Sequence, residues 1–511
     1  MQTDAGPQLL RHWIDRAAAR DPDKAFIVAA DDGRTLTYGQ LRALTGRIAT
    51  YLRDQGVGAN DRIALLSNNS IEHLAVYFGV IAYGATVCTV HVEMNRNQLD
   101  NILPALKPVL VLCEDGLGLD DILKDVSALC LPLGAWDDQR GDSFFAAVNC
   151  CEAGDAHTLA GPDDGAVVLF TSGTSARPKG VVLSFRELLS NAGPTADGFN
   201  MTAEDRIYDF RSFNWCSAQT LSAVPPLCRG ATLILGRKFS RSRFFEHIAR
   251  YGATIATGNP TTVGLLLNGD ALPTRDMPAL RFVTSSSAPL VVDEWRRFEE
   301  KFGVRVAQGY GCSEVGWIAA QPGEQRRIGT VGRPHAYHGL SIVGAEGQML
   351  KRGEMGAVEL GGLRGNVYRT LADDGSFRAD VQGRMKTGDL GFLDGDGYLH
   401  LTGRAKDLII RGGVNISPLE IDGVLMQRTD VVEACTIGVP DKVYGEEVVA
   451  YVVLRPGAVV GEDDILRHCS AKLPAFKTPK QIVLCDALPK TERGKLDRKA
   501  LAERWSHSRS G

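Results

Sequence analysis

Short apolar runs alternate with longer amphipathic segments along most of the chain. Runs such as RIALLS (62–67), VLVLC (109–113) and AVVLF (166–170) have the length and apolar content of buried strands. The segments 41–56 and 242–252 repeat apolar residues at the spacing of an amphipathic helix. This alternation predicts an α/β fold class, built as a large N-terminal domain of α/β layers.

The pattern changes near the C-terminus. The stretch GFLDGDGYLHLTGRAKDLIIRGG (391–413) is rich in glycine and turn residues, and a mixture of helix and strand patterns with a lysine-rich end follows it. We therefore predict a boundary at about residue 406, with a large domain at 1–406 and a small α+β domain at 407–511. A chain of 511 residues is too long for one ordinary core, and a segment of about 100 residues can form its own.

Composition and charge exclude several classes of protein. Hydrophobic residues make up 44% and charged residues 23%, so a packed globular interior is expected and disorder is not. The net charge of −4 gives no overall basic field, which argues against a nucleic-acid partner. Glycines interrupt the longest apolar run, 73–90, which predicts a buried helix followed by a strand and no membrane span.

The eleven cysteines are dispersed, and no C-x-x-C pair occurs. They therefore indicate reduced thiols, not a metal site. The start of the chain shows no signal peptide pattern, so we expect a cytoplasmic protein, and we leave a homo-oligomer open.

The stretch TSGTSARPKG (171–180) is the first candidate for chemistry. It contains four hydroxyl side chains, two glycines, an arginine and a lysine, and strand-like runs flank it on both sides. Glycine allows backbone N–H groups and hydroxyls to converge on an anion, so the composition favours a phosphate loop. A solvated turn is the alternative. It is not a Walker A loop, because the second glycine and the hydroxyl after the lysine are missing.

Four later motifs carry further polar residues. They are QGYGCSEVG (308–316), KTGDLGFLDGDGYL (386–399), GRAKDLIIRGGVNISPLEID (403–422) and LPKTERGKLDRKAL (488–501). Each taken singly has a structural explanation as a capping carboxylate, a surface cation or an ordinary turn.

Taken together and in this order, these motifs resemble the adenylate-forming superfamily of acyl- and aryl-CoA synthetases, adenylation domains and luciferases. The resemblance is strongest to acyl- or aryl-CoA ligases and extends from TLTYGQL (35–41) to GKLDRK (494–499). It implies an ATP-dependent carboxylic acid–CoA ligase that uses ATP, Mg²⁺ and coenzyme A. The acid would first form an acyl-adenylate with release of pyrophosphate, and its acyl group would then pass to the thiol of coenzyme A with release of AMP.

The resemblance also assigns roles to single residues. Lys495 would bridge the acid's carboxylate and the α-phosphate, Glu314 would help to hold Mg²⁺, and Ser313 belongs to the same catalytic turn. Asp389 would accept both ribose hydroxyls, and Asp407 would be the hinge about which the small domain swings. The other predicted nucleotide- and CoA-binding residues are Thr171, Ser172, Gly173, Thr174, Lys179, Tyr310, Gly311, Arg404, Gly412 and Gly413, and the predicted acyl pocket is bordered by Trp215 and Gly309.

Some positions depart from the family pattern. Ala176 stands where glycine is frequent, Phe185 stands where histidine is common, and serines 285–287 replace a glycine-containing run. None of these removes a charged catalytic group, so we expect activity to survive.

The sequence gives less information on which carboxylic acid is the substrate and which thiol accepts the acyl group. No acidic residue in RSFNWCSAQ (211–219) could hold an α-amino group, which argues against amino acids, whereas aliphatic, aryl and dicarboxylic acids stay open. Arg211 could meet a second carboxylate, but we favour a surface salt bridge. No carrier domain follows the ligase segment, which favours coenzyme A. The alternatives are an adenylation enzyme that loads a separate carrier protein and a catalytically lapsed nucleotide-binding module.

Overall fold

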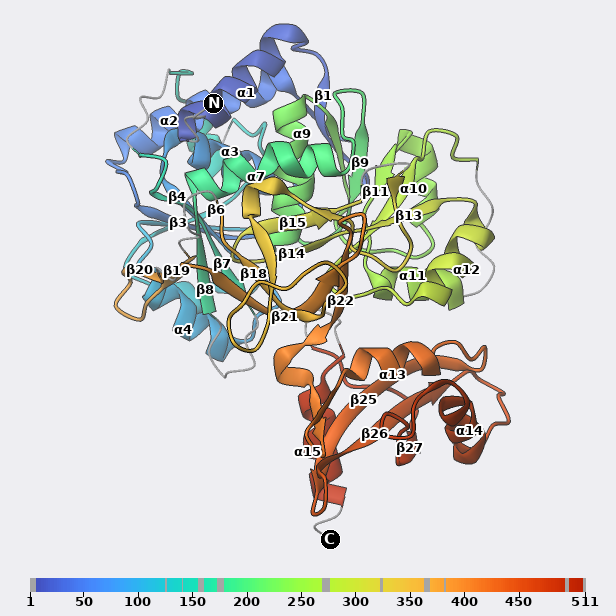
Figure 1. Cartoon of the computed structure of the whole chain (residues 1–511). Coiled ribbons are helices and arrows are strands. Elements are labelled where there is room, and N and C mark those ends of the chain that lie inside the picture. The colour runs from blue at the N-terminus through green and yellow to red at the C-terminus, as the bar shows by residue number, and fades with distance from the viewer. Residues whose placement is uncertain are drawn as a thin grey trace.

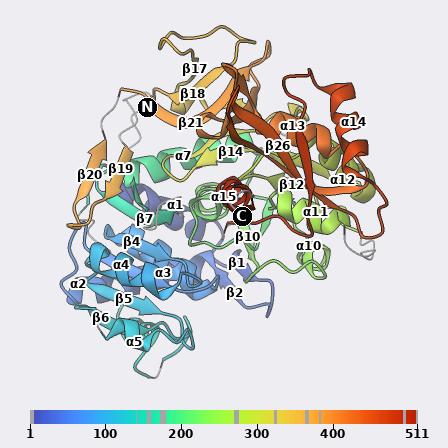
Figure 2. The same ribbon diagram turned by 90° about the horizontal axis from the view of Figure 1, so that it is seen from below.

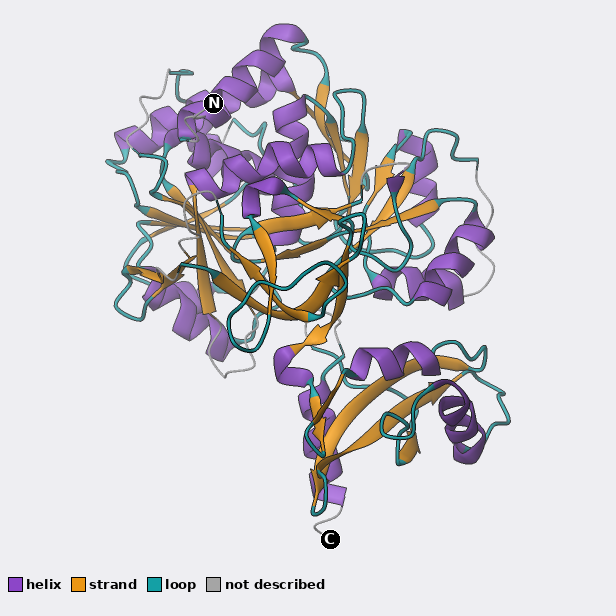
Figure 3. Cartoon of the chain, viewed as in Figure 1, coloured by secondary structure: helices purple, strands orange, loops and turns teal. Residues whose placement is uncertain are grey.

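A computed structural model describes residues 6–124, 126–139, 141–154, 160–171, 179–268, 276–321, 325–362, 368–380, 383–491 and 496–508. Figure 1 shows a large part, coloured blue to yellow, above a smaller part in orange and red. Figure 3 shows that helices gather at the top and flanks of the large part, while strands run through its middle.

The first large sheet has seven strands, which pair in parallel except for β1 with β2. Two of its inner strands, Thr232–Leu235 and Phe282–Ser285, are buried at every position. In spatial order the strands are β13 (Arg305–Gln308), β12 (Phe282–Ser285), β11 (Ile255–Ala256), β9 (Arg206–Asp209), β10 (Thr232–Leu235), β1 (Ala25–Ala29) and β2 (Thr35–Thr37).

The second large sheet has eight strands and is mixed. Strands β7, β4, β3, β5 and β6 are parallel, whereas β8, β19 and β20 add antiparallel pairs at one edge. In spatial order they are β20 (Phe377–Asp380), β19 (Tyr368–Leu371), β8 (Lys179–Ser184), β7 (Gly165–Thr171), β4 (Thr86–Val90), β3 (Arg62–Leu66), β5 (Leu110–Cys113) and β6 (Leu129–Pro132).

Helices pack around both sheets. Every residue of α3 is buried, so the predicted buried helix and following strand at 73–90 are confirmed as α3 and β4. The helices of the large part are α1 (Pro7–Arg20), α2 (Tyr38–Asp54), α3 (Ile71–Tyr83), α4 (Arg96–Leu106), α5 (Asp120–Leu123), α6 (Phe144–Asn149), α7 (Phe185–Gly198), α8 (Cys216–Ala218), a π-turn (Gln219–Ala223), α9 (Val224–Arg229), α10 (Phe244–Tyr251), α11 (Pro260–Asn268), α12 (Val292–Phe302) and a 3₁₀ turn (Ala336–His338).

The large part also contains two smaller antiparallel sheets, and Figure 1 shows β14 and β15 in its middle and β21 and β22 nearer to the C-terminal part. One contains β14 (Tyr310–Cys312), β15 (Gly316–Ala320) and β16 (Arg333–Pro334). The other contains β17 (Leu340–Val343), β18 (Gly356–Leu360), β21 (Met385–Leu393) and β22 (Leu399–Arg404).

The C-terminal part begins after a 3₁₀ turn (Ala405–Asp407) and has its own apolar core. Figure 2, seen from below, shows β26, α13 and α14 in front of the large part. The strands are β24 (Val414–Ile416), β23 (Ile409–Arg411), β26 (Gly445–Leu454), β25 (Val431–Asp441) and β27 (Gln481–Leu484), and the helices are α13 (Pro418–Leu425), α14 (Glu462–Lys472) and α15 (Arg498–Ser508). The predicted fold class is confirmed, whereas the boundary at residue 406 and the mobility of the small domain stay predictions.

Glu294 on α12 is a buried carboxylate whose pKa is affected by charged residues of the C-terminal part. Its residue is 8% exposed, and burial raises its pKa from 4.5 to about 7. Arg297 and Arg455 oppose the rise, and Glu433 of β25 adds to it. Between these pH values the folded protein holds a proton that the unfolded chain has released, so stability falls as the pH rises from about 4.5 to 7.

We predict that Glu294→Gln flattens this fall, which amounts to at most about 1.4 kcal/mol per pH unit. The measurement is the free energy of unfolding at pH 5 and pH 8. Glu300→Gln changes an exposed carboxylate on the same helix and should keep the wild-type slope. An unchanged slope in Glu294→Gln would contradict the assignment.

Candidate active site

The β14–β15 hairpin carries four of the predicted residues. Tyr310 and Gly311 lie on β14, and the half-buried Ser313 and Glu314 form the turn before β15. A Cβ atom at Gly311 would clash with the carbonyl oxygen of Gly316. Glycine is therefore required for the two strands to approach, and the turn is held in one position.

Helix α7 anchors this hairpin through one buried amide. Asn191 donates from Nδ2 to the carbonyl of Trp317 at 2.8 Å and accepts the backbone N–H of Trp317 at 3.2 Å. The turn with Glu314 is thus fixed to a helix of the large core.

Asp389 joins the two small sheets. Tyr310 donates its hydroxyl to Oδ2 of Asp389 at 2.5 Å, and Nε of Arg404 lies 3.0 Å from Oδ1. Asp389 and Arg404 face each other across β21 and β22, and Thr387 accepts the backbone N–H of Asp389. The structure thus brings three predicted site residues, Tyr310, Asp389 and Arg404, into one cluster.

Burial, and next the charge of Asp389, raise the pKa of Tyr310 above its ordinary value. The phenol therefore remains a hydrogen-bond donor at physiological pH. Asp389 itself is 8% exposed, while half of the Arg404 side chain is accessible.

The predicted phosphate loop connects two paired strands. Thr171 ends β7, an inner strand of the eight-stranded sheet, and the exposed Lys179 begins β8 directly opposite it. Ser172, Gly173 and Thr174 lie outside the described residues, as do Ala176 and Lys495. The register fixes where the loop begins and ends.

A buried asparagine ties the two large sheets together beside the site. Asn69 follows β3 and donates from Nδ2 to the carbonyls of Arg211 at 2.9 Å and Gly236 at 3.0 Å. Its Oδ1 accepts the backbone N–H of Phe213 at 2.9 Å. The segment after β9 is therefore held against the end of β3.

Trp215, the predicted wall of the acyl pocket, lies in this segment. Its indole stacks on the imidazole of His91, with ring centroids 4.8 Å apart and an interplanar angle of 27°. Asn214 donates to the carbonyl of Ser67 at 2.9 Å and holds the segment in place.

Arg211 forms an ion pair, as favoured from the sequence, but the pair is buried and not at the surface. Nη2 of Arg211 lies 2.6 Å from Oδ2 of Asp209, and the two side chains are 9% and 0% exposed. Arg211 also donates to Ser286 at 3.4 Å. A buried carboxylate of this kind needs its cation.

The remaining predicted residues have these positions. A Cβ atom at Gly309 would lie 2.5 Å from the ring of Trp317, so the indole packs directly against this glycine. The role of Gly309 in the acyl pocket stays a prediction. Gly412 and Gly413 form the exposed two-residue turn between β23 and β24, with φ of 58° and 83°. Asp407 ends the 3₁₀ turn before β23.

Two departures from the family pattern also have a structural setting. Phe185 is fully buried as the first residue of α7, directly after the N-cap Ser184, which forms a capping box with Glu187. Ser287 has φ of 74°, a left-handed backbone that favours glycine.

Sequence reasoning missed Asn69 and His91. Both follow strands of the eight-stranded sheet, within SNNS (67–70) and directly after Val90. Polar residues placed after buried parallel strands are the signal that could have identified them.

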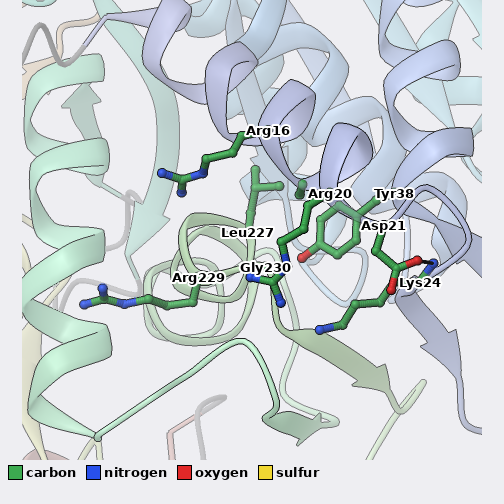
Figure 4. A pocket seen from close by; sticks show the side chains of 9 residues that line it. Arg16, Arg20, Asp21, Lys24, Tyr38, Leu227, Arg229 and Gly230 are labelled. Atoms are coloured by element: carbon green, nitrogen blue, oxygen red, sulfur yellow. Dashed lines mark hydrogen bonds between the residues drawn. The ribbon is translucent and has the colours of Figure 1, made fainter.

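A hollow of about 290 Å³ lies elsewhere, between α1 and α9 (Figure 4). Arg20 and Arg229 lie in the last turns of these helices, where cations offset the partial negative charge of the helix ends. Arg16 donates to the carbonyl of Cys228 and Lys24 to that of Ala203. These cations have structural partners, and no predicted site residue lines the hollow.

Among the described residues, no group of three or more His, Cys, Asp or Glu side chains could hold a metal ion. None of the helices described has both the length and the apolar character needed to cross a membrane.

Known proteins match this chain over nearly its whole length. Residues 14–368 match the family model of AMP-binding enzymes, and residues 420–495 match that of the AMP-binding enzyme C-terminal domain. The sulfoacetate–CoA ligase of Cupriavidus necator is 32% identical, covering 94% of this chain and 95% of the relative. The oxalate–CoA ligase of Arabidopsis thaliana is 31% identical, covering 96% and 98%.

A solved structure is similarly close. The crystal structure of ATP-bound MatB from Rhodopseudomonas palustris superposes with a TM-score of 0.86 at 30% identity, covering 97% of this chain and 99% of that one.

We predict that Arg211→Met lowers the free energy of unfolding by about 3 kcal/mol, because it leaves Asp209 buried without its cation. Urea denaturation measures the loss. Adding Asp209→Asn should recover part of it. Arg42→Met, which breaks an exposed pair with Asp15, should cost no more than about 1 kcal/mol. Equal losses for Arg211→Met and Arg42→Met would refute the prediction.

Proposed function

This chain belongs to the AMP-binding enzyme family, and from that premise we propose how its residues perform the reaction of an AMP-forming acid–CoA ligase. The protein is an ATP-dependent carboxylic acid–CoA ligase. In the first step a carboxylate oxygen attacks the α-phosphorus of ATP, and the bond from that phosphorus to pyrophosphate breaks. In the second step the thiol of coenzyme A attacks the acyl carbon, and AMP leaves. Two observations carry the assignment. Both family models match this chain, and a CoA ligase aligns with it over 95% of the ligase's own length.

The nucleotide would bind at the cluster of Tyr310, Asp389 and Arg404. Among the described residues, Oδ2 of Asp389 accepts from Tyr310 and Oδ1 pairs with Arg404, which leaves each oxygen a lone pair for a ribose hydroxyl. The half-exposed Arg404 would add a charged contact to the nucleotide.

The phosphates would lie along the loop from Thr171 to Lys179, with Ser172, Gly173 and Thr174 as donors. Glu314 fits a Mg²⁺ site, because this cation takes few protein carboxylates and completes its shell with phosphate oxygens and water. When bound, the ion would offset phosphate charge. Ser313 and Gly311 would shape the same turn beside it.

Lys495 would contact both the acid's carboxylate and the α-phosphate in one pose of the C-terminal part. We place the hinge at Asp407, which separates 1–406 from 407–511. In support, Asp407 ends the 3₁₀ turn that leads from β22 of the four-stranded sheet to β23 of the C-terminal sheet. A rotation there would exchange Lys495 for the Gly412–Gly413 turn, beside which the thiol arm would pass.

The acid would lie against Trp215 and Gly309. ATP and coenzyme A are intracellular metabolites, so we place the reaction in the cytoplasm.

The test is a panel of aliphatic, aryl, dicarboxylic and sulfonated acids, with acid-dependent pyrophosphate release measured with and without coenzyme A. AMP and thioester formation that require coenzyme A support the ligase. Pyrophosphate release without thioester formation would favour a carrier-protein acceptor, and no release with any acid would favour a lapsed nucleotide-binding module.

We predict that Lys495→Ala slows adenylate formation at least about a hundredfold, because a charge that stabilises the transition state is lost. Thioester formation from a supplied acyl-adenylate should change less than about tenfold, since Lys495 acts in only one pose. Lys499→Ala, an exposed lysine on α15, is the matched control. Equal losses in both half-reactions would show that Lys495 has no step-specific role.

We predict that Asp389→Asn raises the Kd of ATP by about tenfold or more, because charge-assisted hydrogen bonds to the ribose are lost. Calorimetric titration measures the change. Asp396→Asn, in the exposed β21–β22 turn, should bind ATP like the wild type. An unchanged Kd in Asp389→Asn would mean that the carboxylate is structural.

A further inference from the structure

The hydroxyl of Ser417 forms a hydrogen bond across the predicted hinge. Ser417 directly precedes α13 of the C-terminal part, and its hydroxyl donates to the carbonyl oxygen of Thr402 on β22. Helix α13 packs against β22, on the side of the C-terminal part that faces the large part (Figure 1). Because Ser417 and Thr402 lie on opposite sides of Asp407 in the chain, a rotation at Asp407 would break this bond.

Gly403, the next residue of β22, gives the serine room to approach the strand. A Cβ atom at Gly403 would lie 3.0 Å from Oγ of Ser417 and 3.8 Å from its Cβ. Arg404 follows in the same strand and pairs with Asp389. The hydrogen bond therefore joins α13 to the strand that carries part of the proposed nucleotide site.

The same serine has the sequence setting of a helix cap but does not cap α13 in this structure. From Ser417 to Glu420 the sequence is Ser-Pro-Leu-Glu, which is the pattern of a capping box with proline at the first helical position. However, Ser417 forms no side-chain cap bond, and the Glu420 carboxylate lies 2.7 Å from Nζ of Lys477. Ser184 at the start of α7 has the same pattern and does form the complete box. The hydroxyl of Ser417 is thus used across the hinge in place of the cap.

The Gly412–Gly413 turn is exposed in this pose of the C-terminal part. In the proposed reaction the thiol arm passes beside that turn, so thioester formation would use another pose, in which Ser417 has left Thr402. A released Ser417 hydroxyl has an acceptor lone pair for the backbone N–H of Glu420. A serine cap and a side-chain hydrogen bond contribute similar free energies, so one bond can replace the other.

We propose that Ser417 is a two-position hydrogen-bond switch for the hinge. In the pose described here its hydroxyl holds α13 to the carbonyl of Thr402. After rotation the hydroxyl caps α13 by accepting the backbone N–H of Glu420. The exchange keeps the two poses close in free energy, so the C-terminal part can alternate between them during turnover. This inference rests on the proposed function, which supplies the hinge and the second pose.

The first test joins the two parts covalently with Gly403→Cys and Ser417→Cys in one chain. The Cβ separation of 3.8 Å at these positions is that of an ordinary disulfide. The reduced form of the same variant is the control. Oxidation should slow thioester formation from a supplied acyl-adenylate at least about fiftyfold and change adenylate formation less than about threefold. Dithiothreitol should reverse the loss, and wild type treated in the same way should change in neither step.

The second test follows the cap through hydrogen exchange of the Glu420 amide, with AMP alone and with AMP plus coenzyme A. We expect coenzyme A to slow this exchange at least about threefold in wild type, because the released hydroxyl then accepts the amide proton. Ser417→Ala should show no such effect, whereas Ser417→Thr keeps the hydroxyl and should behave like wild type. Ser470→Ala, which changes an exposed serine on α14, should retain the full effect.

Three results would overturn the switch alone. They are thioester formation that persists in the oxidised variant, parallel loss of both steps on oxidation, and a Glu420 amide that coenzyme A does not protect in a wild type that forms the thioester. Absence of pyrophosphate release by the wild type with any acid would instead overturn the proposed function, and this inference with it.

Discussion

One buried amide, Asn69, holds together the edges of the two large sheets, and the site depends on that contact. The carboxyl ends of parallel strands meet at one edge of a sheet, so ligands bind where two such edges converge. Asn69 follows β3 and contacts the backbone after β9 and after β10. The segment with Trp215 is thereby held against the strands that carry His91 and Thr171.

A second contact links the two small sheets in the same way. Asp389 receives Tyr310 from the β14 hairpin and Arg404 from β22, and Asn191 secures the hairpin to α7. Polar side chains thus join elements whose apolar faces belong to different cores. Because Asp389, Tyr310 and Asn191 are buried, each is costly to leave without its partner, and the partners fix the relative positions of the sheets.

The sequence predicts the α/β class well because buried parallel strands appear as uninterrupted apolar runs, as at 166–170. Motif order indicates candidate site residues, and three of them, Tyr310, Asp389 and Arg404, lie in contact, while their roles stay predictions. The neighbours of His91 could not be predicted, since β4 and β7 pair across a long crossover that no local pattern encodes. The burial of Arg211 was missed for the same reason, because its partner Asp209 is two residues away but the enclosing walls come from distant segments.

Ser287 is the third serine of the triplet 285–287, which begins at the last residue of β12. Its left-handed φ of 74° costs roughly 1 kcal/mol for a residue with a Cβ atom, and glycine would avoid that cost. Directed evolution for thermostability alone would therefore favour glycine at this position. Selection for turnover would retain serine only if its hydroxyl contributes to catalysis.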